Sequence, residues 1–365
     1  MDRVVVAMSG GVDSAVAASL LVEEGFEVIG ITMQIWPEGK AIPATARGCC
    51  SIDAVEDARR VSQSLKMPHY VLNLREEFDR TVIKDFIHEY QEGRTPNPCV
   101  QCNKHIKFDA LMERAEALGA RWVATGHYAR TRYNEDSGRW ELHRALDPAK
   151  DQSYVLYPLT QRQLSQALFP LGEWTKEHTR ERAFELGLKV AGKADSQEIC
   201  FVPDRNYAGF LESVDPQTVQ PGKVVDTTGA VRGEHRGVAF FTVGQRKGLG
   251  IASNEPLYVK EIDPTRNLVV VGRDAEVMER SCLVSDVNWI GVPPPDGQLE
   301  VTARIRYNMR EAPACIEPAS GGRWLLTFHT PQRAITPGQS AVFYRDDLVL
   351  GGGIIDRARP GAESS

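Results

Sequence analysis

The sequence of 365 residues has no long apolar run, no internal repeat and no low-complexity block. Because no stretch of about 18 residues is free of charge, no membrane span is expected. A targeting pattern is also missing, since residues 1–3 lead directly into a short apolar run, and a cytoplasmic location is expected. With 42 % apolar and 25 % charged residues, the composition is typical of a soluble globular protein and excludes a mainly disordered, collagen-like or coiled-coil chain.

An excess of positive charge is absent as well. The chain has 43 Lys and Arg against 49 Asp and Glu, a formal net charge of −6, which excludes a protein that is basic over its whole surface. Local patches decide nucleic-acid binding more than the total charge does. Three basic islands, at residues 94–107, 223–247 and 304–310, therefore remain compatible with an RNA partner.

Strand and helix patterns alternate along the first 130 residues. Short apolar runs, typical of buried parallel strands, occur at residues 4–8, 28–35, 70–72 and 122–126. Helical patterns occur at residues 14–24, 51–66, 76–90 and 108–118, and later at 161–168 and 176–186. This alternation predicts an α/β domain, with a parallel sheet covered by helices on both faces.

Beyond about residue 206 the pattern changes to short β-like runs between Gly, Pro and Asp turns. The runs lie at residues 224–225, 238–243, 258–262, 268–271, 299–307, 324–329, 341–344 and 348–355. We therefore predict an α/β catalytic domain over residues 1–205, a small β-rich central domain over residues 206–274 and a C-terminal β-barrel over residues 275–360.

The segment Ser9-Gly10-Gly11-Val12-Asp13-Ser14 lies between the first predicted strand and the first predicted helix. Two glycines allow a tight turn and a close approach of the backbone to a ligand. The amides of the helix start, with the positive end of the helix dipole behind them, favour an anion. A serine-capped turn that binds nothing is the alternative, but the whole hexapeptide after a buried strand favours a phosphate site. Residues 187–194 and 244–250 only approximate phosphate-loop patterns, and the second segment is interpreted as a basic loop.

The seven cysteines form an odd and unevenly spaced set, which argues against a disulfide scaffold. Cys99 and Cys102 form a C-x-x-C, and a helix is predicted to begin near Cys102, where the dipole and the nearby lysines Lys104 and Lys107 would lower a thiol pKa. Cys200 follows alone in a polar stretch. A zinc half-site, a redox pair and an iron–sulfur cluster on Cys99, Cys102 and Cys200 stay open, the cluster as a possibility that is not favoured. The other cysteines are interpreted as structural or incidental: Cys49, Cys50, Cys282 and Cys315.

Residues 9–14 resemble the pyrophosphate loop of the N-type ATP pyrophosphatases, which cleave ATP between the α and β phosphates. Further segments resemble the bacterial tRNA-specific 2-thiouridylase family, in the expected order along almost the whole chain. These segments are residues 93–107, 124–128, 150–154, 195–201, 242–250, 304–307 and 337–344. The resemblance implies an N-terminal domain like that of the adenine nucleotide α-hydrolases.

The resemblance also implies an activity, the ATP-dependent 2-thiolation of uridine at the wobble position of tRNA. ATP would adenylate the uracil O2 and release pyrophosphate, and sulfur would then displace AMP. Cys200 would carry the sulfur as a persulfide received from an upstream sulfur-relay protein, and Cys102 would be the partner nucleophile, leaving a Cys102–Cys200 disulfide. Asp13 would orient the loop or the metal–pyrophosphate. Mg²⁺ is expected from the phosphate chemistry, although no ligand set is visible.

Site residues follow from the same resemblance. The ATP pocket would be formed by Ala7, Met8, Ser9, Gly10, Gly11, Val12, Asp13, Ser14, Met33 and Gly126. The target base would meet Asn97, Pro98 and Cys99, the last of which is aspartate in some family members. The C-terminal barrel would help to hold the anticodon stem-loop of the tRNA. The residues in contact with tRNA would be His127, Lys150, Asp151, Gln152, Arg306, Tyr307 and Gln339. Two alternatives stay open, another adenylating ligase and an RNA-binding metal sensor.

Overall fold

The computed structural model describes residues 2–36, 52–193, 199–202 and 206–356. Its N-terminal part is built on a parallel sheet with the strand order β3-β2-β1-β4-β7. The strands are β1 (Arg3–Ala7), β2 (Glu27–Gln34), β3 (His69–Asn73), β4 (Trp122–Ala124) and β7 (Ala167–Leu168). The predicted parallel sheet is confirmed, with β1 at its centre.

Helices cover both faces of this sheet because successive side chains of β1 point to opposite sides. Val4 and Val6 belong to a hydrophobic cluster with helices α1 (Val12–Glu23), α2 (Ile52–Ser64) and α8 (Lys176–Glu185). Val5 and Ala7 belong to a second cluster, which includes α6 (Leu111–Ala117) and α7 (Gln161–Gln166). The continuous apolar run at the N-terminus is therefore a strand that is buried on both faces.

Two long helices each contain a π-helical segment. Helix α3 (Arg75–Phe78) continues through Asp79–Ile83 into α4 (Lys84–Gln91), and α5 (Pro98–Gln101) continues through Cys102–Ala110 into α6. The second helix therefore begins at Pro98. The sequence analysis predicted a helix start near Cys102 and a helical pattern only from residue 108, so both predicted starts were too late. Proline suits the first helical position because its missing N–H would have no partner within the helix.

The hairpin of β5 (Ala129–Asn134) and β6 (Arg139–Arg144) leaves the N-terminal part and joins the C-terminal one. Strand β6 pairs antiparallel with β17 (Leu348–Ile355) through Leu348 with His143 and Val349 with Leu142. The sequence analysis did not predict this hairpin, whose strands carry many charged residues.

The central unit contains α9 (Tyr207–Val214) and a four-stranded sheet with the order β10-β11-β8-β9. Its strands are β8 (Gly222–Asp226), β9 (Val231–His235), β10 (Tyr258–Asp263) and β11 (Leu268–Gly272). The prediction of a strand at residues 238–243 was wrong, since Val238–Phe240 is a 3₁₀ turn and the rest of the run is not in a strand. Phe240, Phe241 and Val243 are buried with α4 instead, so their apolar character serves packing between units.

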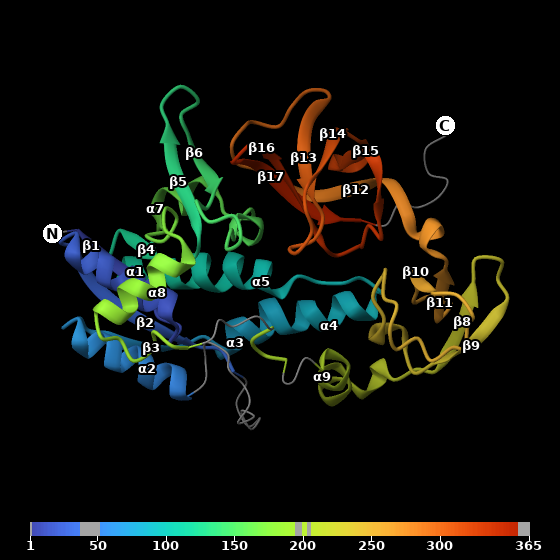
Figure 1. Ribbon diagram of the computed structural model, residues 1–365, viewed down its shortest axis with the longest axis horizontal. Helices are drawn as coiled ribbons and strands as arrows, with labels where there is room; N and C mark the ends of the chain where they lie inside the picture. Colours follow the sequence, from blue (N-terminus) through green and yellow to red (C-terminus); the bar gives the residue numbers. More distant parts are fainter. Residues whose placement is uncertain (1, 37–51, 194–198, 203–205, 357–365) are drawn as a thin grey trace.

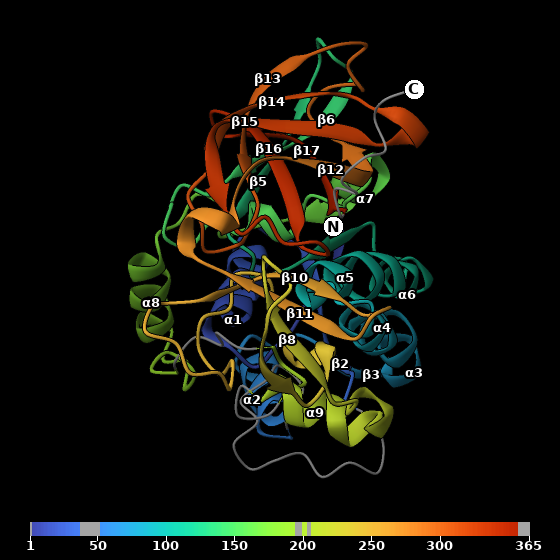
Figure 2. The ribbon, with the colours of Figure 1, turned by 90° about the vertical axis from the view of Figure 1, so that its right-hand side faces the viewer.

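The C-terminal unit is a closed six-stranded barrel in which β12 pairs with both β15 and β17. Its strands are β12 (Met278–Trp289), β13 (Leu299–Arg304), β14 (Ala312–Pro318), β15 (Trp324–Arg333), β16 (Ser340–Arg345) and β17. Figures 1 and 2 show the barrel on one side of the parallel-sheet unit, with α4 and α5 running toward the other two units. Within the part of the chain that the structure describes, no helix combines the length and apolar character needed to cross a bilayer.

Candidate active site

The predicted phosphate loop lies where the order of the parallel sheet reverses. The chain moves from β1 to β2 and β3 on one side, and β4 and β7 pair on the other side. Ligands of open α/β sheets bind at this switch point, outside the carboxyl ends of the strands. Ala7 ends β1 and Met8 follows it, Met33 lies near the end of β2, and Gly126 follows β4. The structure thus brings these four predicted ATP residues to the edge that carries the loop.

The loop itself is held by short contacts and leaves the start of α1 without a capping side chain. The Ser14 hydroxyl donates to the Gly11 carbonyl (3.2 Å) and lies 3.1 Å from the Ser9 hydroxyl. Gly10 has φ +66°, and a β-carbon there would overlap the Ala54 carbonyl, so both conformation and space require glycine. Gly11 at the N-cap has no side chain to accept from the first amides of α1. Those amides can therefore serve an anion.

Two lysines that the sequence analysis missed lie beside the loop. Lys176 Nζ contacts both carboxylate oxygens of Asp13 at 2.7 and 2.8 Å. Lys193 Nζ donates to the Gly10 carbonyl at 3.0 Å and lies 3.2 Å from an Asp57 oxygen. No motif marks Lys176 in the sequence. Lys193 belongs to residues 187–194, which the sequence analysis set aside because they only approximate a phosphate-loop pattern, and only the fold brings this residue and α8 to the loop.

The strand end after β4 also touches the loop. A β-carbon at Gly126 would lie 2.7 Å from the Ser14 backbone nitrogen, so only glycine permits this approach. The Tyr128 hydroxyl donates to Asp13 Oδ1 at 2.9 Å. The segment at residues 124–128 thus contacts the loop through Gly126 and Tyr128.

The predicted base-binding residues form the entry to the helix that begins at Pro98. Asn97 is its N-cap, Pro98 is buried, and Cys99 is exposed in the first turn. The barrel holds this entry from one side: Gln339 Nε2 donates to the Thr95 and Pro96 carbonyls at 3.0 and 3.1 Å. Gln339, predicted to contact tRNA, therefore also anchors the loop that carries Asn97.

The cysteines of the predicted chemistry lie in one hydrophobic neighbourhood. Cys102 and Cys200, both partly exposed, pack against the same cluster, formed by α3, α4 and the central unit. The Phe201 ring sits between Phe78 and Phe86, with centroids at 5.5 and 5.2 Å, and this fixes the backbone next to Cys200. Because the helix begins at Pro98, Cys99 rather than Cys102 occupies its first turn, and the prediction of a helix start near Cys102 was wrong.

An ion pair between Asp151 and Arg304 joins the N-terminal part to the barrel. Asp151 is 6 % exposed, accepts from the Ser153 hydroxyl at 3.0 Å, and lies 3.6 Å from an Arg304 nitrogen. Tyr307 is 40 % exposed, and its ring packs edge-on against Tyr154 at 5.9 Å. Partial burial, followed by the negative charge of Asp151 and Cys99, raises the pKa of Tyr307. The Tyr307 phenol is therefore neutral at physiological pH and presents an aromatic surface near Cys99.

His127 is buried, with 7 % exposure, and its ring contacts other side chains of the protein. Lys107 Nζ lies 3.3 Å from Nε2, and Thr125 Oγ1 lies 2.7 Å from Nδ1. An ammonium only donates, so Nε2 accepts and Nδ1 carries the proton. Burial, and then Lys107, hold the pKa of His127 well below its ordinary value. His127 is therefore a neutral imidazole whose two ring nitrogens contact Lys107 and Thr125.

The remaining predicted tRNA residues differ in their surroundings. Gln152 exchanges hydrogen bonds with the Tyr128 backbone, and Lys150 is partly exposed. Arg306 donates to the Val243 and Ala334 carbonyls at 2.9 and 3.0 Å and to Thr336, and thereby links the central unit to the barrel. Burial, and then Arg333, lower the pKa of Arg306. Its contacts within the protein show that it joins two units.

The described residues offer no ready metal ligand set. No group of three or more His, Cys, Asp or Glu side chains lies close enough together there to hold a metal ion. Cys99, Cys102 and Cys200 therefore do not form such a group. Both oxygens of Asp13 contact Lys176. Residues 195–198 of the matching segment and the pair Cys49 and Cys50 lie outside the described residues.

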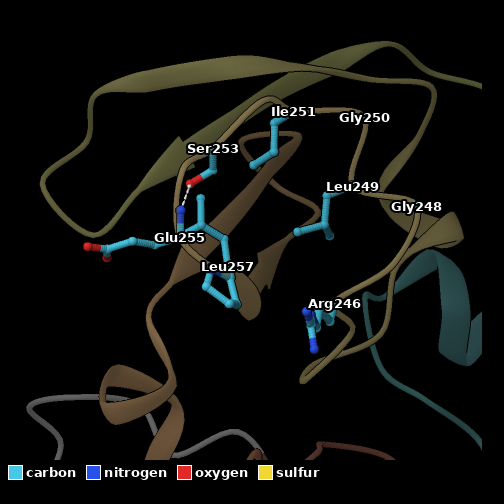
Figure 3. Close-up of a pocket in the computed structure, with 9 residues that line it drawn as sticks. Arg246, Gly248, Leu249, Gly250, Ile251, Ser253, Glu255 and Leu257 are labelled. Carbon is cyan, nitrogen blue, oxygen red and sulfur yellow. Dashed lines mark hydrogen bonds between the residues drawn. The ribbon is translucent and has the colours of Figure 1, made fainter.

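A hollow of about 300 Å³ opens in the central unit (Figure 3). Its lining comes from one segment: Arg246, Gly248, Leu249, Gly250, Ile251, Ser253, Glu255, Pro256 and Leu257. Arg246 and Lys247 are exposed, which agrees with the interpretation of residues 244–250 as a basic loop.

Comparisons with known proteins cover almost the whole chain. Family models match in three ranges: the tRNA methyl transferase HUP domain at residues 2–204, the tRNA methyl transferase PRC-barrel domain at residues 209–273 and the aminomethyltransferase beta-barrel domain at residues 279–355. A protein of Heliobacterium modesticaldum named tRNA-specific 2-thiouridylase MnmA is 54 % identical over 359 residues, 98 % of this chain and 93 % of that protein. The chain belongs to the tRNA-specific 2-thiouridylase family.

Further members of the 2-thiouridylase family agree with this assignment. The MnmA protein of Clostridium perfringens is 52 % identical over 354 residues, 97 % of this chain and 98 % of that protein. The MnmA protein of Moorella thermoacetica is 53 % identical over 352 residues, 96 % of this chain and 98 % of that protein. Family membership confirms that the chain is an enzyme. The family models, together with the three sheets, confirm the predicted fold class of a parallel-sheet domain, a small β-rich unit and a C-terminal barrel.

Proposed function

We propose that the enzyme converts uridine at the wobble position of tRNA to 2-thiouridine, using ATP and a cysteine persulfide. The observation that carries this proposal is that two thiols, Cys102 and Cys200, pack against one hydrophobic cluster, which is formed by α3, α4 and the central unit. Membership of the 2-thiouridylase family supports the same substrate. Since tRNA is the proposed substrate, we place the enzyme in the cytoplasm. We also propose domain limits near residues 205 and 274.

The first step makes a leaving group, because a carbonyl oxygen leaves poorly. The uracil O2 attacks the α-phosphate of ATP, the bond between the α and β phosphates breaks, and pyrophosphate remains in the loop. The amides at the start of α1 and the hydroxyls of Ser9 and Ser14 suit an anion of this kind. Magnesium normally accompanies such phosphates, and we derive no step through it.

The second step transfers sulfur. The terminal sulfur of the Cys200 persulfide attacks C2 of the adenylated uridine, and AMP leaves with the former O2. The Cys102 thiolate then attacks Cys200 Sγ, the sulfur–sulfur bond of the persulfide breaks, and its electron pair stays with the sulfur on C2. The resulting Cys102–Cys200 disulfide is reduced by a dithiol before an upstream sulfur-relay protein reloads Cys200. Dividing one difficult displacement in this way is the general logic of covalent catalysis.

The target base must leave its stack to reach both thiols and the nucleotide. We propose that Asn97, Pro98 and Cys99 receive it, and that the exposed ring of Tyr307 contacts the RNA nearby. Aromatic side chains are common partners of unstacked bases in single-stranded RNA. Lys150, Asp151, Gln152, Arg306, Gln339 and His127 would position this surface, by contact with the RNA or through the neighbours described above.

A methyl transfer to tRNA is the second candidate, because two of the family models carry that description. Methyl transfer would require neither a pyrophosphate loop nor a pair of thiols such as Cys102 and Cys200. The purified protein distinguishes the two reactions when it is incubated with an unmodified tRNA transcript, ATP and a persulfide donor, and the nucleosides are then analysed by mass spectrometry.

The proposal predicts 2-thiouridine, with AMP and pyrophosphate formed in equal amounts and only when tRNA is present. ATP cleavage without thiolation would instead support another adenylating ligase. A methylated nucleoside would support methyl transfer, and metal-dependent RNA binding without pyrophosphate release would support a metal sensor. Each of these three results would overturn the proposal.

A further inference from the structure

Asp13 places a negative charge where an anion is to bind. It lies in the first turn of α1, among the amides that suit a phosphate, and its side chain is 32 % exposed. A carboxylate at this point can occupy the same amides as the phosphates and repels them through space. A loop that binds pyrophosphate therefore needs something to hold this carboxylate away and to balance its charge.

Lys176 meets both needs. Its ammonium contacts both Asp13 oxygens, and its side chain is only 10 % exposed, so water screens the pair weakly. The position of Lys176 is itself fixed, since its backbone N–H donates to Asp147 at 3.0 Å and Thr175 caps helix α8. Tyr128, which follows the neighbouring parallel strand β4, adds a hydrogen bond to Asp13.

We propose that Lys176 is a positioning residue for nucleotide binding, which acts by holding and neutralising Asp13. With Lys176 in place, the carboxylate is held toward α8, and the loop amides stay available to the β and γ phosphates. Without Lys176, the same carboxylate becomes a competing anion in the loop. This inference rests on the proposed use of ATP, since it concerns the same site.

A purely structural role is the rival explanation, because the pair also joins α8 to α1. The chain offers a matched control for it. Arg182 of α8 contacts Glu23 of α1 at 2.8 Å, at the end of α1 far from the loop. Arg182→Met removes an ion pair between the same two helices and leaves the charge of Asp13 unchanged.

The test is the dissociation constant of inorganic pyrophosphate and of ATP, measured by calorimetry on the full chain, with thermal unfolding of each variant recorded alongside. We expect Lys176→Met to weaken both ligands about tenfold or more. Lys176→Arg, which keeps the cation, and Arg182→Met should bind like the unaltered protein. The double variant Asp13→Asn with Lys176→Met should regain most of the lost affinity, because the competing anion is gone.

Two results would overturn the inference. One is unchanged binding by a folded Lys176→Met variant. The other is a double variant as weak as Lys176→Met, since that result would assign Lys176 to direct phosphate contact. If the unaltered chain binds neither ligand, the proposed use of ATP fails, and this outcome is distinct from both.

Discussion

Among single residues, the two thiols Cys102 and Cys200 carry the proposed chemistry. Replacing either by serine keeps the size of the side chain and removes the nucleophile. We expect Cys102→Ser and Cys200→Ser each to lower 2-thiouridine formation about a hundredfold or more, with ATP binding unchanged. Cys315→Ser in barrel strand β14 is the matched control and should thiolate normally. Full activity of either variant would contradict the assignment.

The buried imidazole of His127 gives a pH-dependent prediction for stability. Its pKa is lowered in the folded chain, so below an ordinary value near 6.5 only the unfolded chain takes up this proton. The free energy of unfolding should therefore fall as the pH drops from 6.5, by up to about 1.4 kcal/mol per pH unit from this group. His127→Asn should show a flatter profile between pH 7 and 5 by denaturant unfolding. Parallel profiles for the two proteins would show that His127 is not buried in its neutral form.

What could be predicted at the residue scale follows from chemistry that is local in the chain. Gly10 and Ser14 could be placed because the loop, the strand before it and the helix after it are contiguous. Lys176 could not, since it lies 163 positions from Asp13, and an isolated lysine near a helix start is usually solvated. The burial of His127 was also beyond the sequence, because it depends on Phe108 and Phe169 packing around the ring.

Between elements, the loop around Gly338 of the barrel supports the base-binding entry. A β-carbon at Gly338 would lie 2.9 Å from the backbone nitrogen and oxygen of Thr95, and the residue has φ +86°. Gly338→Ala should therefore push residues 95–97 aside and lower the thiolation rate about tenfold or more, with ATP affinity unchanged. The rate is measured with saturating ATP and limiting tRNA.

Gly229 provides the control for backbone strain. It has the same φ of +86°, and a β-carbon there would meet nothing within 4 Å. Gly229→Ala thus carries the same conformational penalty of about 1–2 kcal/mol without a clash. Equal thiolation rates for Gly229→Ala and Gly338→Ala would contradict a positioning role of the barrel loop.

At the element scale, periodicity predicted the strands and helices that are buried on a regular face. It did not predict β12, which carries several polar residues and owes its place to pairing with both β15 and β17. The run at residues 238–243 shows the converse, because its apolar side chains are needed against α4 although the backbone is not a strand. In both cases packing between units, rather than local preference, decided the structure.

Over the whole molecule, the hairpin β5–β6 makes the N-terminal unit and the barrel one structural body. Leu142 of β6 is fully buried, in a cluster that includes Tyr344 and Val349 of the barrel. Leu142→Ala should cost about 2–5 kcal/mol of stability and speed hydrogen exchange in β17 as well as in the hairpin. Unchanged protection of β17 in a destabilised variant would show that the units unfold separately.

The order of the three units along the chain could be predicted because the sequence changes near residue 206 from alternating strand and helix patterns to short β-like runs. Their contacts could not, because pairing between β6 and β17 joins segments about 200 residues apart in the chain. The basic islands could be located as well, but Arg306 in one of them bonds to carbonyls of two units. A charge pattern alone does not tell a phosphate contact from a link within the protein.

The central claim, that this chain thiolates the wobble uridine of tRNA, is tested most directly in cells. Transfer RNA is isolated from cells that lack the protein and analysed by mass spectrometry of its nucleosides. The account predicts that 2-thiouridine and its derivatives at the wobble position disappear, and that they return with the unaltered chain but not with Cys200→Ser. Normal wobble 2-thiouridine in cells without the protein would contradict the account.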